Sequence, residues 1–76
     1  MKTFALFQLC NAGRIWVSVA SNVANSIEDA ERNLNTFSSM MGGGVVLELT
    51  ESEAAMRVAH LNHNEMEDRI ADQMAL

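Results

Sequence analysis

The sequence predicts an α+β fold of the order ββαβα, in which a three-stranded antiparallel or mixed sheet carries one helix on one face and a C-terminal helix or helix pair. Three features lead to this prediction: two apolar runs joined by a short glycine turn, an amphipathic helix pattern that ends at three consecutive glycines, and a helix-capping motif after a third apolar run. A chain of 76 residues, 49% of them apolar, has room for one folded domain. We divide it into a ββαβ core over residues 1–50 and an acidic helical segment over residues 51–76.

The first two strands are expected over residues 3–10 and 15–20, joined by a turn at Gly13. Residues 3–10 are apolar at both odd and even positions, which is typical of a central strand covered on both faces. The second run alternates, and the pair predicts a hairpin. The faces of the first strand are Phe4, Leu6 and Cys10, and Ala5, Phe7 and Leu9. The faces of the second strand are Ile15, Val17 and Val19, and Trp16, Ser18 and Ala20.

A helix is expected to begin after Ser26, whose side chain is suited to cap it. Asp29 stands three residues later, and acidic residues fill the first turn, where the helix dipole favours them. Apolar residues then recur three and four positions apart, which predicts one buried stripe that ends before three glycines. The stripe consists of Ile27, Ala30, Leu34, Phe37 and Met41, and the glycines are Gly42, Gly43 and Gly44.

A third strand is expected over residues 45–49, with Val45, Leu47 and Leu49 on its buried side. A right-handed crossover makes the second and third strands parallel, and the third strand then lies beside the first, which gives the strand order 2-1-3. The first helix covers one face of this sheet. The other face carries Trp16 and Val46, and either the C-terminal helices or a second subunit covers it.

The C-terminal segment opens with a capping box, Thr50 and Glu53, so a helix is expected directly after Thr50. The apolar pattern then weakens, and Asn64 and Glu67 repeat the capping signal. Two alternatives remain open: a short third helix that begins there, or one continuous helix to the C-terminus. In either case one narrow apolar stripe is expected, suited to a dimer seam or a docking ridge. The stripe consists of Met66, Ile70 and Met74.

Charge is distributed unevenly along the chain. Residues 1–47 hold three basic and three acidic side chains, whereas residues 48–76 hold two basic and seven acidic ones and carry the whole net charge of −5. Binding of nucleic acid needs clustered Lys and Arg, so the composition argues against nucleic acid as a direct ligand. A basic protein surface is the complementary partner. The alternative is that the acidic residues form a solvated helix face.

Two sets of side chains have the chemistry of a reactive site. His60, His63 and Glu67 share a face if the C-terminal segment is one helix, and two imidazoles with a carboxylate can hold zinc. A turn over residues 62–64 would remove that face. Cys10 is a possible nucleophile, but a cysteine in an apolar strand typically packs as a buried residue. We therefore expect no enzymatic activity, no metal and no cofactor.

The expected location is the cytoplasm. No apolar run reaches the length that spans a bilayer, and the first residues lack the length of a signal peptide. A single cysteine excludes a disulfide within the chain, which fits a reducing compartment.

In size, acidity and element order the chain resembles the small accessory proteins that bacteriophages make against host machinery, such as anti-CRISPR proteins and phage inhibitors of host RNA polymerase. The resemblance implies stoichiometric inhibition, with carboxylates placed where nucleic acid phosphates would bind a basic groove, in the host cytoplasm. We expect a homodimeric protein-binding inhibitor or adaptor. The alternative is a structural or assembly subunit whose function is self-association. The expected contact residues are Glu51, Glu53, Glu65, Glu67, Asp68, Asp72, Trp16, Met66, Ile70 and Met74.

Overall fold

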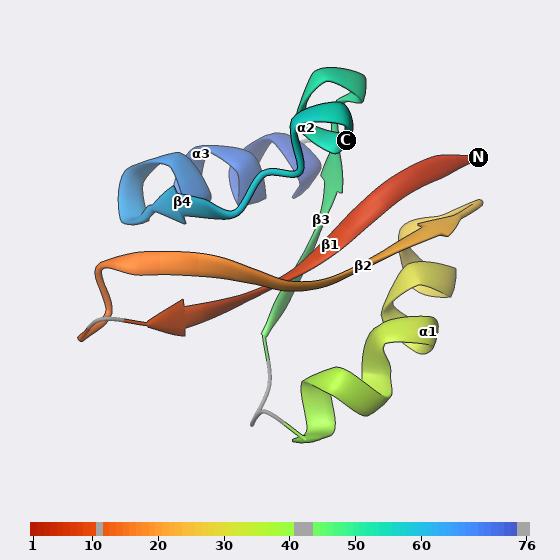
Figure 1. The fold of residues 1–76 in the computed structure, drawn as a ribbon, viewed down its shortest axis with the longest axis horizontal. Helices are drawn as coiled ribbons and strands as arrows, with labels where there is room; N and C mark the ends of the chain where they lie inside the picture. The colour runs from red at the N-terminus through yellow and green to blue at the C-terminus, as the bar shows by residue number, and fades with distance from the viewer. Residues whose placement is uncertain (11, 41–43, 75–76) are drawn as a thin grey trace.

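The computed structural model describes residues 1–10, 12–40 and 44–74, and for residues 35–40 it describes the backbone alone. The strands form one sheet in the order β3-β1-β2-β4, and each neighbouring pair is antiparallel. Figure 1 shows this twisted sheet with α1 on one side and α2 and α3 on the other. The elements are β1 (Lys2–Cys10), β2 (Ile15–Ala24), α1 (Ile27–Met40), β3 (Val45–Leu49), α2 (Glu51–Met56), β4 (His60–Asn62) and α3 (His63–Met74).

The predicted α+β class is confirmed, and β1 lies between β2 and β3 as predicted. The three-stranded sheet and the ββαβα order are wrong, because β4 adds a fourth strand beside β2. β4 has three residues, of which only Leu61 is apolar, so it leaves no strand pattern in the sequence. The continuous C-terminal helix is also wrong. α2 ends at Met56 and is followed by Arg57, whose left-handed φ of 53° stops the helix, and α3 begins at His63.

The β1–β2 ladder contains a bulge that changes which side chains face which helix. The register shifts by one residue between Leu6 and Phe7, which leaves Val19 as the extra residue in β2. The prediction placed Trp16 and Val46 on the face opposite the first helix; it is confirmed for Trp16 and wrong for Val46. Beyond the bulge the alternation is reversed, so Trp16 packs on the α3 side of the sheet while Val46 packs on the α1 side.

Both ends of the hairpin differ from the prediction. β2 continues to Ala24, past the predicted end at residue 20, because Lys2–Ala5 of β1 provide pairing partners for Ser21–Ala24. At the turn, Leu9 is half exposed. Cys10 is exposed as well, so the prediction of a buried cysteine is wrong.

The core consists of two apolar clusters, one on each face of the sheet. The predicted two-sided burial of β1 is confirmed for Phe4–Phe7, whose side chains are at most 2% exposed. Even-numbered residues of this run face α1, and odd-numbered residues face α2 and α3. The cluster on the α1 side contains Phe4, Ala24 and Ala30, with Ile27 and Val46 packed against it. The cluster on the α3 side contains Ala5, Phe7, Leu47, Leu49 and Met66, with Trp16, Val45, Ala54, Val58, Leu61 and Ile70 packed against it.

α1 begins at Ile27 as predicted, because the Ser26 Oγ accepts a hydrogen bond from the Asp29 N–H at 3.2 Å. Its predicted inner stripe is confirmed for the buried Ala30 and Leu34. The other predicted stripe residues and two of the three glycines lie outside the described side chains: Phe37, Met41, Gly42 and Gly43. Gly44 permits a close backbone approach, since a Cβ there would lie 2.7 Å from the carbonyl oxygen of Phe7.

Candidate functional site: the acidic face of α2 and α3

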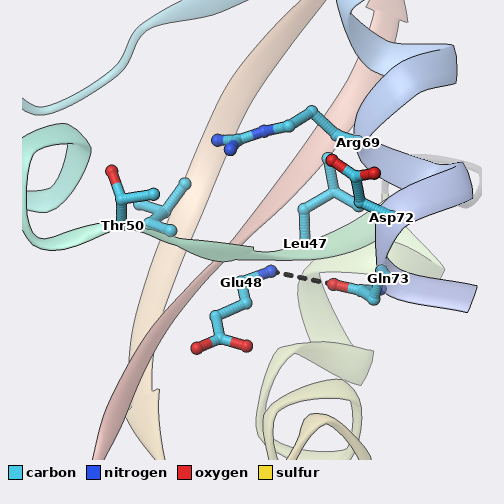
Figure 2. A pocket seen from close by; sticks show the side chains of 7 residues that line it. Leu47, Glu48, Thr50, Arg69, Asp72 and Gln73 are labelled. Atoms are coloured by element: carbon cyan, nitrogen blue, oxygen red, sulfur yellow. Dashed lines mark hydrogen bonds between the residues drawn. The ribbon is translucent and has the colours of Figure 1, made fainter. Parts of the chain in front are cut away.

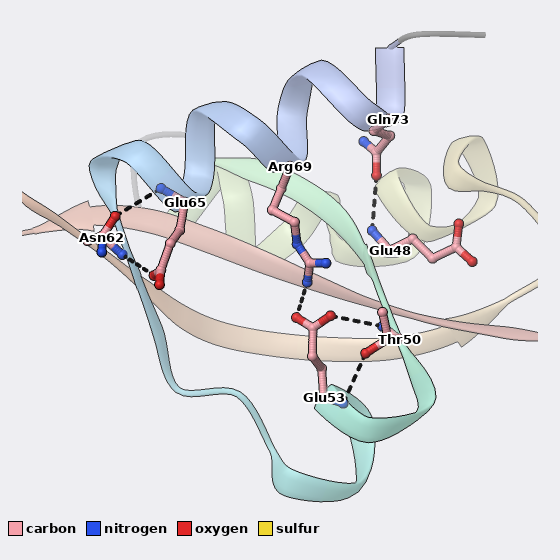
Figure 3. Close-up of polar contacts among 7 residues, drawn as sticks. All are labelled: Glu48, Thr50, Glu53, Asn62, Glu65, Arg69 and Gln73. Atoms are coloured by element: carbon pink, nitrogen blue, oxygen red, sulfur yellow. Dashed lines mark hydrogen bonds and ion pairs between the residues drawn. The ribbon is translucent and has the colours of Figure 1, made fainter.

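α2 begins at the predicted capping box. The Thr50 Oγ1 accepts from the Glu53 N–H at 3.2 Å, and the Glu53 Oε1 accepts from the Thr50 N–H at 3.3 Å. The other oxygen of the Glu53 carboxylate pairs with the guanidinium of Arg69 on α3 (Figure 3). The two side chains are only 20% and 26% exposed, so this ion pair is partly shielded from water. One carboxylate therefore caps α2 and holds it to α3.

α3 begins at a second capping box, at Asn62 rather than at the predicted Asn64. The Asn62 Oδ1 accepts from the Glu65 N–H at 2.9 Å, and the Glu65 Oε2 accepts from the Asn62 N–H at 3.0 Å (Figure 3). Because β4 ends at Asn62, this box marks the direct change from strand to helix. Glu67 has a different role: its Oε1 lies 2.9 Å from the His63 Nε2, one turn earlier on the same helix.

The side chains of α3 divide into an inner and an outer face. The inner face consists of the buried Met66 and the half-buried Ile70 and Gln73, and Arg69 lies beside them toward Glu53. The helical period places the acidic residues on the rest of the surface, where all are exposed. The single arginine of α3 is thus turned inward while its carboxylates face solvent. We call these carboxylates the α3 acidic face: Glu65, Glu67, Asp68 and Asp72.

The predicted acidic contact residues fall into three groups. Glu53 faces Arg69 rather than solvent, so its prediction as an outward contact is wrong. Glu65 and Glu67 are exposed and make the local contacts described above. The remaining three are exposed, and within the described residues no hydrogen bond or ion pair engages their side chains. These are Glu51, Asp68 and Asp72.

Most of the predicted apolar contact residues belong to the core. Met66 is 1% exposed, so the prediction that it forms a docking ridge is wrong. Trp16 and Ile70 are half-buried and pack against the same cluster as Met66. The Trp16 Nε1 is buried and has no hydrogen-bond partner among the described residues. Met74, at the end of α3, is 77% exposed and is the member of the predicted stripe that solvent reaches freely.

The proposed histidine cluster is not assembled. His60 lies on β4 and His63 on α3, so the common helix face that the prediction required does not exist. His63 pairs with Glu67, but the described residues contain no group of three His, Cys, Asp or Glu side chains placed to hold a metal ion. The Cys10 Sγ lies 3.7 Å from the Gln8 carbonyl oxygen, at the exposed end of β1.

Gln73 has a role that the sequence did not indicate. Its Oε1 accepts from the Glu48 N–H at 3.0 Å, and its Nε2 donates to the Val46 carbonyl at 3.0 Å (Figure 3). Both backbone groups lie on the outer edge of β3, where the described part of the chain adds no further strand. The carboxamide thus makes the pair of bonds that an added strand would make. The contact spans more than 20 residues of sequence, so no local motif predicts it.

A hollow of about 250 Å³ lies between β3 and α3 (Figure 2). Its basic lining residue, Arg69, is already paired with Glu53, and Glu48 lies 3.6 Å from the Lys2 Nζ. Asp72 is therefore the charged lining residue that no described cation neutralises. The hollow suits a cationic group of a ligand or partner. The lining residues are Leu47, Glu48, Leu49, Thr50, Arg69, Asp72 and Gln73.

Comparisons of the chain with protein-family models, curated proteins and solved structures give no match. Among the described residues, no helix combines the length and the apolar character needed to cross a membrane.

Proposed function

We propose that this chain is a protein-binding inhibitor or adaptor that docks the α3 acidic face onto a basic surface of a partner protein. The observation that carries the proposal is the division of charge on α3: four carboxylates face outward, and the one arginine of the helix faces inward to Glu53. Arg69 does not cancel the charges of Asp68 and Asp72, which have no partner among the described residues. They remain available to a cationic neighbour.

The spacing of the carboxylates suits a basic groove. Glu65 and Asp72 are seven positions apart, which places the acidic residues along about 10 Å of helix. Glu65, Asp68 and Asp72 lie within about 60° of one another around the helix, and a basic nucleic-acid-binding surface attracts such a row of negative charges. The resemblance to phage proteins that act against host machinery supports the same interpretation. We therefore propose that the partner is a nucleic-acid-binding protein and that the chain acts stoichiometrically, by occupying the site of the phosphates.

Affinity also needs apolar contact, since exposed charges mainly set the rate and the specificity of encounter. Met74 is the exposed apolar side chain at the C-terminal end of α3, and Asp72 lines the adjacent hollow. A long Lys or Arg side chain of the partner suits this hollow, because its charge would meet Asp72. The proposed contact therefore centres on the C-terminal half of α3.

The test is affinity purification of the tagged protein from its native host, with mass spectrometry of the captured proteins. The wild type is compared with Asp68→Asn/Asp72→Asn and with a matched control, Glu28→Gln/Glu31→Gln, which changes the net charge equally on α1. Neither aspartate makes a described contact, so folding should be preserved. We expect the α3 variant to weaken binding at 0.1 M salt by about tenfold and to flatten its salt dependence, while the control binds like the wild type.

Two outcomes would contradict the proposal. Equal loss of binding in both double variants would show that net charge matters and the α3 acidic face does not. Capture that is unchanged in Asp68→Asn/Asp72→Asn would remove this surface from the interface. A captured partner without a basic surface would leave an adaptor but exclude the mimicry of nucleic acid.

A further inference from the structure

The two edges of the sheet are closed to different degrees. At the β3 edge, the carboxamide of Gln73 occupies two outward backbone groups. At the other edge, β4 covers β2 only over Ile15–Val17, and the Ala59 carbonyl accepts one further bond from the Ser18 N–H at 3.0 Å. Beyond Ser18, the described part of the chain gives β2 a strand partner on the β1 side alone.

The direction of the free backbone groups follows from the ladders. Val46 and Glu48 bond outward to Gln73, so the alternate residues of β3 are those that bond to β1. The register carries this alternation across β1 to β2, where the even-numbered residues of 20–24 bond to β1. The N–H and C=O groups of Ser21 and Val23 therefore point to the open edge.

The open edge lacks the usual features that prevent strand pairing. Residues 19–23 read Val-Ala-Ser-Asn-Val, without a charge and without proline. Val23 is 55% exposed, one of few large apolar side chains in that state among the described residues. The stretch has a valine at each end and a serine at the centre, so it presents nearly the same surface in both directions. Such a sequence can pair with itself about a two-fold axis.

We infer that a second copy of the chain pairs with this edge, antiparallel, about a two-fold axis at Ser21. The serine exchanges two backbone hydrogen bonds with Ser21 of the second copy, and each Val23 lies opposite Val19 of the other chain. The two four-stranded sheets then form one continuous sheet of eight strands. The pairing covers the exposed Val23, and it ends at the bulge, where the regular ladder of β2 stops.

The surroundings of the edge fit a second copy of an acidic chain. A hollow of about 380 Å³ lies between this edge and α2, lined in part by Ser18, Ser21 and Arg57, and leaves room for the side chains of an added strand. The charged residue of this lining is a cation, and the α3 acidic face belongs to another part of the surface. Five paired residues bury much less than the roughly 1,200 Å² of a stable interface, so we expect a dissociation constant on the order of 100 μM.

The test is sedimentation equilibrium of the full chain from about 10 μM to 1 mM. We expect the mass to rise from that of the 8.4 kDa monomer toward twice that value. Val23→Lys places a charge at each end of the proposed seam, opposite Val19 of the second copy, on a side chain exposed enough to leave the fold intact. It should weaken dimerisation at least about tenfold. Met56→Lys is the control, because Met56 is 79% exposed on α2 and the charge change is the same.

Two results would overturn the proposed pairing of two copies at the β2 edge. A wild type that stays monomeric at 1 mM would overturn it. An equal shift by Val23→Lys and Met56→Lys would also overturn it, since association would then depend on net charge or on another surface. Circular dichroism of each variant checks that a loss of dimer is not a loss of fold.

The two-fold register has its own test. Directly opposite residues that share hydrogen bonds have Cα atoms about 5.5 Å apart, within the range that a disulfide bridges. Ser21→Cys in a Cys10→Ser background should therefore give a covalent dimer under mild oxidation. The wild type, whose exposed Cys10 is off the axis, is the control and should cross-link much more slowly. Equal rates in the two proteins would overturn the register.

Discussion

The two faces of the sheet are covered in different ways. On one face, α1 is a single helix of 14 residues that follows β2 after a two-residue connection and buries Ala30 and Leu34. On the other face, α2 has no buried residue, and α3 has one, Met66. The second face is instead joined by polar contacts between elements, of which the Glu53–Arg69 ion pair is the most shielded.

This difference explains how a short acidic segment stays folded while its carboxylates face water. Helices of six and twelve residues are too short to be stable alone, so their order depends on contacts with the sheet. Met66 provides the apolar contact, and the capping boxes and Gln73 fix the ends and the direction of the helices. The acidic residues that take part in these polar contacts are those near the sheet, and the other acidic residues are exposed to solvent. We expect the α3 side to open before the α1 side does.

The largest expected effect comes from truncating a buried phenylalanine on either side of β1. Phe7→Ala and Phe4→Ala should each lower the free energy of unfolding by about 3–4 kcal/mol, because both side chains are buried. Urea denaturation measures the loss. Phe7 packs on the α3 side and Phe4 on the α1 side. We therefore expect Phe7→Ala to remove hydrogen-exchange protection from α3 and Phe4→Ala to remove it first from α1. The same exchange pattern in both variants would mean that the two faces are not separate units.

Met66→Ala should cost somewhat less, about 2–3 kcal/mol, since a surface helix can settle partly into the space. The same truncation in α1, Leu34→Ala, provides the matched variant, because Leu34 is 2% exposed. We expect Met66→Ala to leave α1 protected in hydrogen exchange and to release α3, which has no other buried side chain. An α3 that stays protected in Met66→Ala would show that the polar contacts alone hold it.

The ion pair between α2 and α3 should contribute about 1 kcal/mol. Glu53→Gln keeps a side chain that can complete the capping box but removes the charge opposite Arg69, and this pair is only about one quarter exposed. Glu51→Gln is the control, because Glu51 lies in the same helical turn, is exposed and has no described partner. Its loss should stay near 0.3 kcal/mol. Thermal unfolding of the two variants at low and high salt distinguishes them, and equal losses would show that the Glu53–Arg69 ion pair does not stabilise the fold.

Local signals account for the parts of the fold that the sequence predicted. The Gly13 turn, the Ser26 cap and the Thr50 capping box each depend on residues within four positions, and all three are found in the structure. The uneven distribution of charge along the chain likewise follows from counting the charged residues of the sequence. The bulge at Val19 is different, since it depends on how β1 and β2 pair, and it reverses the alternation of β2 toward the hairpin turn.

The sequence predicted where the acidic residues of the candidate site lie along the chain, but not which of them make contacts. Counting acidic residues located the charged segment, but the contacts that sort its carboxylates reach across the fold. Glu53 and Arg69 are 16 positions apart, and Gln73 is 25 positions from Glu48. β4 is a further example: its three residues are a strand only because β2 offers an edge beside them.

Replacing Gln73 should affect stability less than replacing Glu53 and should also change self-association. Gln73→Ala should lower the free energy of unfolding by about 0.5 kcal/mol, because water can replace both hydrogen bonds at an exposed edge.

Gln73→Ala also frees the Val46 carbonyl and the Glu48 N–H, so β3 becomes a second open edge. Together with the β2 edge this allows chains of molecules rather than closed dimers. Sedimentation should then show species larger than a dimer in Gln73→Ala, and Gln73→Glu should lie between it and the wild type, since a carboxylate can accept from Glu48 but cannot donate to Val46. An unchanged distribution in Gln73→Ala would mean that the fold of α3 over β3, and not this carboxamide, closes the edge.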